Sequence, residues 1–204
     1  LSVAMTLAFY PRGGSAQVVR YLGRALQSLG NDVTVYCGSL GPPGVASHAA
    51  TFLDGLPVQA LDFTEAVAWF DDGRDPMDAP VPIHPSFEDR PGVPDRVFVS
   101  IDTDAYDLQV ATWHTLLSKT GPPDLYHVHH LTHVNDAVQR VDPRPVVAHL
   151  HGTELKMLDD IRTGAQDRWP HAAAWDRRLV AAAHRADRVI VISPTDRRLA
   201  VDLL

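Results

Sequence analysis

Residues 2–37, SVAMTLAFYPRGGSAQVVRYLGRALQSLGNDVTVYC, decide the fold class of the chain. The stretch opens with a nearly continuous apolar run at 2–10, which is typical of a strand buried on both faces. Residues 16–29 place apolar side chains at helical spacing, and Gly30 favours the end of a helix. A second apolar run at 32–37 predicts another buried strand. This order of strand, helix and strand is typical of a parallel sheet.

The rest of the chain continues the alternation. We expect a helix over 102–119, strands within 122–130, 142–152 and 186–193, a helix over 172–185, and a final helix from Ser193 and Pro194. Serine is a preferred N-cap residue and proline suits the first helical position. The sequence therefore predicts the α/β class: a Rossmann-like, doubly wound, mostly parallel sheet with helices on both faces.

The segment between the second strand and residue 96 has no regular pattern. It holds most of the prolines, and the run DAPVPIHPSFEDRPGVPDR at 78–96 cannot form a regular helix. We expect residues 75–96 to form a long loop beside the site or a mobile flap. With 204 residues, 45% of them hydrophobic, the chain is expected to form one domain over 1–204.

Composition excludes several partners. The net charge of -7 and the scattered arginines argue against a nucleic-acid surface, which needs a clustered basic face. Because no apolar run reaches about 18 residues and the opening stretch lacks a positively charged segment, we expect a cytoplasmic protein. The single cysteine, Cys37, lies in an apolar run and is expected to serve packing.

The turn after the first strand, YPRGGSAQ, is the first candidate site. It lacks the G-x-G-x-x-G spacing of dinucleotide-binding folds, which disfavours NAD. Gly13, Gly14 and Ser15 stand at a helix N-terminus, where free amides can bind an anionic or polyhydroxy ligand. A purely structural turn explains the two glycines equally well.

Histidines form the second candidate site, because six of the eleven lie between His127 and His151. His127 and His129 are two apart on a predicted strand and so share a side, and His149 and His151 repeat the spacing. This pattern indicates a cleft at the carboxyl ends of adjacent strands. Such pairs also serve zinc hydrolases, so a metal site remains an alternative interpretation.

The third candidate is HLHGTELK at 149–156, where Gly152, Thr153 and Glu154 follow a strand. Thr153 suits either a ligand contact or the cap of a short helix that begins near Leu155. The Glu154 carboxylate suits either a sugar hydroxyl or a histidine that it holds in place.

In their order and spacing, these motifs resemble the N-terminal, acceptor-side domains of family 4 glycosyltransferases. That retaining GT-B group includes glycogen synthase-like enzymes and enzymes of the mycothiol and bacillithiol pathways. The resemblance is carried by GGSAQVVRYLGRALQSLGNDVTVY at 13–36, DLYHVHH at 124–130, VVAHLHGTELK at 146–156 and ADRVIVISPTDRRL at 186–199. Residues 75–96 match nothing general in the group.

The resemblance implies transfer of a hexosyl group from a nucleotide sugar, with retention, to a small-molecule, lipid or glycan acceptor. It implies no metal and no cofactor beyond the nucleotide-sugar co-substrate. It matches His129 with the catalytic histidine that contacts the transferred sugar. It assigns substrate binding to Gly13, Gly14, Ser15, His130, His151, Gly152, Thr153 and Glu154.

Only one domain of a two-domain enzyme fits this length. We expect the protein's own C-terminal domain to bind most of the nucleotide sugar, and the isolated half to be inactive because it lacks the positive charge that stabilises the leaving group. Peripheral membrane contact is compatible with a lipid acceptor. The alternatives are a histidine-rich metal-dependent hydrolase and a non-catalytic, flavodoxin-like binding module.

Overall fold

The structure is a computed structural model that describes residues 1–141, 143–164 and 169–204. Its centre is a six-stranded sheet in the order β3-β2-β1-β4-β5-β6, in which every neighbouring pair is parallel. The strands are β1 (Ser2–Leu7), β2 (Asp32–Ser39), β3 (Val58–Asp62), β4 (Leu125–His129), β5 (Val146–His149) and β6 (Arg188–Ile190). The predicted Rossmann-like α/β class is confirmed. Strand order reverses between β1 and β4, and such switch points are where open α/β sheets bind ligands.

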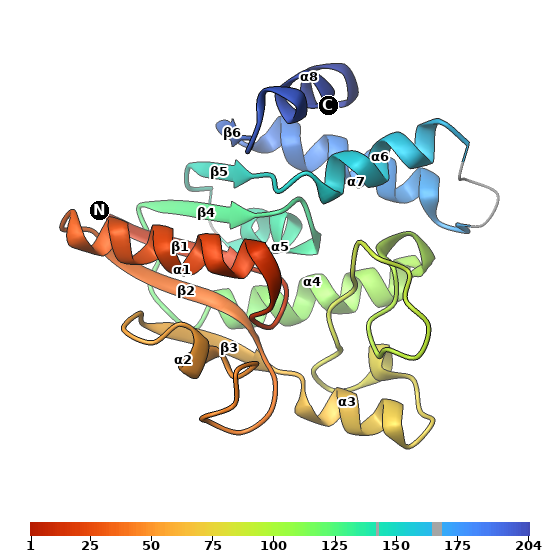
Figure 1. The fold of residues 1–204 in the computed structure, drawn as a ribbon, viewed down its shortest axis with the longest axis horizontal. Coiled ribbons are helices and arrows are strands. Elements are labelled where there is room, and N and C mark those ends of the chain that lie inside the picture. The colour runs from red at the N-terminus through yellow and green to blue at the C-terminus, as the bar shows by residue number, and fades with distance from the viewer. Residues whose placement is uncertain (142, 165–168) are drawn as a thin grey trace.

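Helices cover both faces of the sheet. They are α1 (Gly13–Ser28), α2 (Ala49–Phe52), α3 (Thr64–Asp71), α4 (Thr103–Leu117), α5 (His133–Val141), α6 (Thr153–Arg162), α7 (Ala172–Arg185) and α8 (Pro194–Leu203). In Figure 1, α1 crosses one face of the sheet and α4 and α5 lie behind the other. No helix in the described part of the chain combines the length and apolarity needed to cross a bilayer.

Helix α1 packs tightly on β1 because Gly23 has no side chain. A β-carbon at Gly23 would stand 3.0 Å from Leu56 Cδ1 and 3.5 Å from Met5 Sδ. Ala16 and Val19 bury completely on the same helix. Met5 pairs in register with His127, so α1 covers the sheet face that also carries the His127 side chain.

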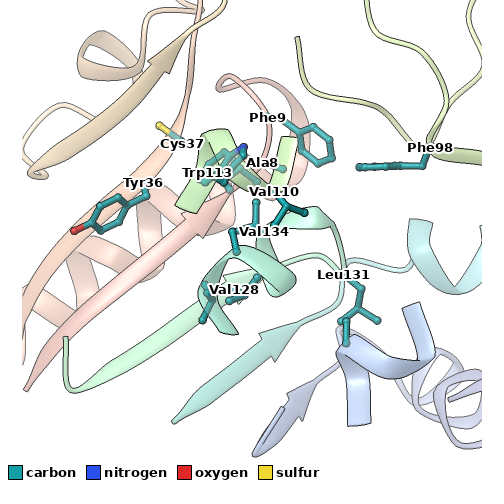
Figure 2. Close-up of a cluster of buried hydrophobic side chains, with 14 of the residues drawn as sticks. Ala8, Phe9, Tyr36, Cys37, Phe98, Val110, Trp113, Val128, Leu131 and Val134 are labelled. Carbon is teal, nitrogen blue, oxygen red and sulfur yellow. The ribbon is translucent and has the colours of Figure 1, made fainter. Parts of the chain in front are cut away.

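The opposite face holds the larger apolar core. Val110 and Trp113 of α4, Val134 of α5 and Val128 of β4 are buried to 1% exposure or less, and Figure 2 shows them gathered in one layer. Burial of each such side chain contributes about 1.5 to 3 kcal/mol. This layer fixes β4, and therefore fixes where the histidines after it are placed.

Three details differ from the sequence predictions, and one is not described by the structure. The region after β2 contains β3 and α3, which were missed because β3 is an edge strand with a short apolar run and α3 buries only Ala66. Helix α5 (His133–Val141) lies between two predicted strands, where no helix was expected. Helix α1 begins three residues early, at Gly13. Asp142, the first residue of one predicted strand, lies outside the described residues.

Other local predictions are confirmed. Helix α7 has the predicted bounds. The Ser193 hydroxyl accepts a hydrogen bond from the Asp196 amide and so caps α8, with Pro194 in its first turn. Cys37 is fully buried, and burial raises the pKa of its thiol to about 12, which fits a packing role.

The proline-rich segment is held by an isolated parallel β-bridge between Ser86 and Val97. The Ser86 amide donates to the Arg96 carbonyl, and the Phe98 amide donates to the Ser86 carbonyl. Ile83 and His84 are fully buried. The segment therefore presents fixed side chains beside the carboxyl ends of the strands.

Candidate active site

A pocket of about 430 Å³ lies at the carboxyl ends of β1, β4 and β5. Its walls come from Phe9 and residues 12–15 after β1, from residues 86–88 and 90 of the proline-rich segment, and from His130, His151 and Thr153. The pocket therefore joins the glycine turn, the histidine motif and the HGTE motif at the switch point of the sheet. It also gives the proline-rich segment a place in one wall.

The glycine turn opens toward this pocket. Gly13 has a φ of 69°, in the left-handed region, and nothing lies within 4 Å of the β-carbon position of Gly13 or Gly14. No side chain caps the N-terminus of α1. The amides of the first turn are therefore available to an oxygen-rich ligand, and the helix dipole favours a negative one.

Two arginines and one buried carboxylate connect the walls of the pocket. Arg12 and Arg90 each donate to Asp95 Oδ2 at 2.7 Å, and the Asp95 side chain is only 2% exposed. Burial opposes ionisation of Asp95, but the hydrogen bond from Arg12 and the surrounding charges hold its pKa below the usual range. The Asp95 carboxylate thus ties the proline-rich segment to the β1–α1 loop. The sequence analysis missed this group, because Arg12 and Asp95 are 83 residues apart.

His130 breaks the side-to-side alternation of β4. Its φ is 68°, and among the described residues it is the one non-glycine residue with a positive φ. This conformation costs about 1 to 2 kcal/mol. Its Nδ1 lies 3.4 Å from Glu154 Oε1. Both of its ring nitrogens are buried, and neither has a hydrogen-bond partner among the described residues. A strained residue that lines a pocket is a candidate for function.

Glu154 holds this part of the site together. It also accepts hydrogen bonds from the His151 amide and the Thr153 hydroxyl, each at 3.2 Å. Burial opposes ionisation of Glu154, but the His130 charge and hydrogen bond keep its pKa below the usual value. Of the two roles expected for Glu154, the geometry shows contact with a histidine, since Glu154 itself does not line the pocket.

Thr153 does not cap a helix, so that alternative is wrong. The N-cap of α6 is Gly152, with a φ of 90°, and no side chain bonds to the helix start. Thr153 lines the pocket instead, whereas Gly152 does not. The left-handed glycine lets the chain turn from β5 into α6, which sets Thr153 at the rim.

Four imidazoles form a stack across β4 and β5. This agrees with the prediction that the two histidines of each H-x-H pair lie on the same side of their strand. The rings of His127 and His129 lie 4.7 Å apart, and those of His149 and His151 lie 4.8 Å apart. A hydrogen bond of 3.3 Å joins His127 Nε2 and His149 Nδ1, and one of 3.0 Å joins His129 Nδ1 and His151 Nε2. We call His127, His129 and His149 the inner histidines.

The stack is uncharged near neutral pH. Burial lowers the pKa of His127 to about 4 and that of His151 to about 3, and it lowers the pKa of His129 and His149 as well. His129 is fully buried and does not line the pocket. Its contact with a sugar therefore stays a prediction, and in this geometry it reaches the pocket through the ring of His151.

A family model described as Glycosyltransferase Family 4 matches residues 12–204. The chain belongs to glycosyltransferase family 4. The match begins at the glycine turn and covers every wall of the pocket except Phe9. The predicted resemblance to the N-terminal GT-B domains of family 4 is confirmed.

The fold of this family 4 chain is similar to that of a solved structure. Sucrose-phosphate synthase from Thermosynechococcus elongatus matches with a TM-score of 0.58 and 14% identity, over 98% of this chain and 44% of its own. The glycotransferase of kitacinnamycin matches with a TM-score of 0.46 and 16% identity, over 95% of this chain and 46% of its own. The chain thus spans less than half the length of these proteins. A search of curated protein sequences gave no significant match.

Proposed function

We propose that the chain is the acceptor-binding half of a retaining glycosyltransferase, which transfers a hexosyl group from a nucleotide sugar to a small-molecule, lipid or glycan acceptor. One observation carries the proposal. The pocket at the switch point brings the open glycine turn, His130 and the rim residue Thr153 together, in a chain matched by the family 4 model from residue 12 onward.

The donor end of this proposed site is the N-terminus of α1. The amides of Gly13, Gly14 and Ser15 would donate hydrogen bonds to oxygens of the diphosphate or the acceptor, because no side chain occupies them. The protein's own C-terminal domain would bind the nucleotide and supply the positive charge that stabilises the leaving diphosphate.

The acceptor end is built around His130. Nδ1 lies 3.4 Å from Glu154 Oε1, and Nε2, which is buried and has no partner among the described residues, would bond an acceptor or sugar hydroxyl. Glu154 fixes the tautomer and orientation of the ring, as a carboxylate does for a catalytic histidine. His151 and Thr153 would complete the wall, and His129 would hold His151 in place through its 3.0 Å contact.

The hydrolase alternative receives less support from this geometry. A hydrolytic metal needs an open position for water and substrate, but none of the inner histidines lines the pocket. We propose that the transfer step uses no metal ion and that the nucleotide sugar is the only co-substrate. A non-catalytic module would not account for the family match over residues 12–204.

The test is a transfer assay on the complete enzyme with a panel of nucleotide sugars, read by mass spectrometry of the products. We expect one nucleotide sugar to be consumed with formation of a glycosylated product whose anomeric configuration equals that of the donor. Release of free sugar alone at every acceptor tried, or a product of inverted configuration, would contradict the proposal.

A further inference from the structure

The inner histidines form a cluster that the proposed transfer reaction uses only through the contact of His129 with His151. One ring nitrogen from each of His127, His129 and His149 lies within 4.8 Å of the other two. The three residues are 6%, 0% and 8% exposed. They lie on the α1 face of the sheet, where His129 and His149 are partners in register. Three imidazoles converging from two rigid strands match the ligand number of a zinc site.

The distances within the cluster suit a zinc ion. A tetrahedral ion with Zn–N bonds of about 2.0 to 2.1 Å separates its ligand nitrogens by about 3.3 Å. His127 Nε2 and His149 Nδ1 are 3.3 Å apart. The rings of His127 and His149 are stacked, with planes that differ by 20°, so turns about χ2, a broad torsion for histidine, are needed to direct the nitrogens at one point.

For the third ligand, the candidate atom is one that otherwise lacks a partner. His129 Nε2 is buried and has no hydrogen bond among the described residues, and such an orphan atom ordinarily costs about 1 to 3 kcal/mol. His129 Nδ1 meets His151 Nε2 at 3.0 Å. Ligating histidines are usually held in this way through their second nitrogen.

We propose that His127, His129 and His149 bind one Zn²⁺ ion on the α1 face of the sheet, and that the ion has the structural role of joining β4 to β5. Three protein ligands leave the fourth position of a tetrahedral ion to a water molecule. None of the three ligands lines the pocket, so the ion would act on the proposed transfer site only through the contact of His129 with His151. The inference does not depend on the proposed function.

The test is metal analysis of the protein produced without a histidine tag and purified without chelator. We expect about one zinc per chain after dialysis against metal-free buffer. Added Zn²⁺ at about 100 times its Kd should raise the Tm by about 5 to 10 °C. Co²⁺ in place of Zn²⁺ should give the visible bands of a four-coordinate ion.

Variants assign the ion to the cluster. His127→Leu and His149→Gln should each bind less than a tenth as much zinc as the unaltered protein, while His114→Gln on α4 should bind as much. Far-UV circular dichroism shows whether each variant is folded. If both cluster variants unfold, the zinc content and cobalt spectrum of the unaltered protein decide alone. Less than about a tenth of an equivalent of zinc, or full zinc binding by either folded cluster variant, would overturn the proposal.

Discussion

His130 and His127 are three residues apart in one motif, yet they have different surroundings. His127 follows the alternation of β4 and stacks with the other inner histidines on the sheet. His130 follows the end of β4 in a left-handed conformation, contacts Glu154 and lines the pocket. The histidine spacing in the sequence thus indicates the region of the site, whereas the backbone conformation determines which imidazole lines the pocket.

The largest expected effect comes from removing the pocket member of this comparison. His130→Ala in the complete enzyme should lower kcat/KM about 100-fold, because our proposal gives its unpartnered Nε2 the hydrogen bond to the acceptor or sugar hydroxyl. Initial rates of product formation measure it. His114→Ala, on the surface of α4, is the control. Unchanged rates for His130→Ala would place the reacting groups elsewhere.

A third histidine, His133 of α5, lies on the apolar side of the sheet and extends the comparison. His133 is fully buried, and burial, with a smaller effect from His84, lowers its pKa to about 3. Its pKa in the unfolded chain is about 6.5, so the unfolded state binds the proton first and stability falls as pH drops below about 6.5. The free energy of unfolding should fall by about 2 kcal/mol between pH 7 and pH 5 from His133 alone.

Urea denaturation at the two pH values measures this loss. His133→Leu should be less sensitive to pH by about the same 2 kcal/mol. His84, whose pKa burial lowers to about 4, contributes to the remaining dependence. An equal pH dependence in His133→Leu and the unaltered protein would show that His133 is not buried as described.

The proline-rich segment forms another wall of the pocket, and its attachment to the β1–α1 loop depends on Asp95. Asp95→Asn should lower the free energy of unfolding by about 1 to 2 kcal/mol, because it weakens two charge-assisted hydrogen bonds from Arg12 and Arg90. Urea denaturation gives this value, and Asp89→Asn on the same segment, which is exposed, is the matched control. Equal losses in both variants would mean that Asp95 does not tie the segment down.

The smallest effect is expected at the glycine turn. Gly13→Ala should cost about 1 kcal/mol of stability from its positive φ alone, because no atom lies near the new β-carbon. Gly14→Ala, at a position with no positive φ, should cost less. Thermal denaturation of the two variants compares them, and a larger loss for Gly14→Ala would contradict the assigned backbone.

Much of this fold could be predicted from periodicity. The apolar runs of β1 and β2 and the helical spacing of α7 were sufficient to predict these elements. In each of them, the tertiary structure buries most of the side chains that the local sequence pattern marks as apolar. Helix α5 was missed although Val134, Ala137 and Val138 have helical spacing. Thr132 carried a further signal, since its hydroxyl accepts a hydrogen bond from the Val134 amide near the start of the helix.

The site was predicted only in part. Its location followed from the positions of motifs at strand ends, and His130, His151 and Thr153 do meet the glycine turn in one pocket. The turn of His130 toward Glu154 could not be predicted, because a positive φ at histidine leaves no mark in the sequence. The contact of Arg12 and Arg90 with Asp95 requires the tertiary fold as well.

One measurement tests the central claim most directly: a crystal structure of the complete enzyme with a nucleotide sugar that supports transfer and with its acceptor. The account predicts the acceptor in the pocket at the ends of β1, β4 and β5, within hydrogen-bond distance of His130 Nε2. A second hollow of about 310 Å³, lined largely by apolar residues, lies among α7, β6 and α8. An acceptor bound there, or bound without contact to His130, would contradict the account.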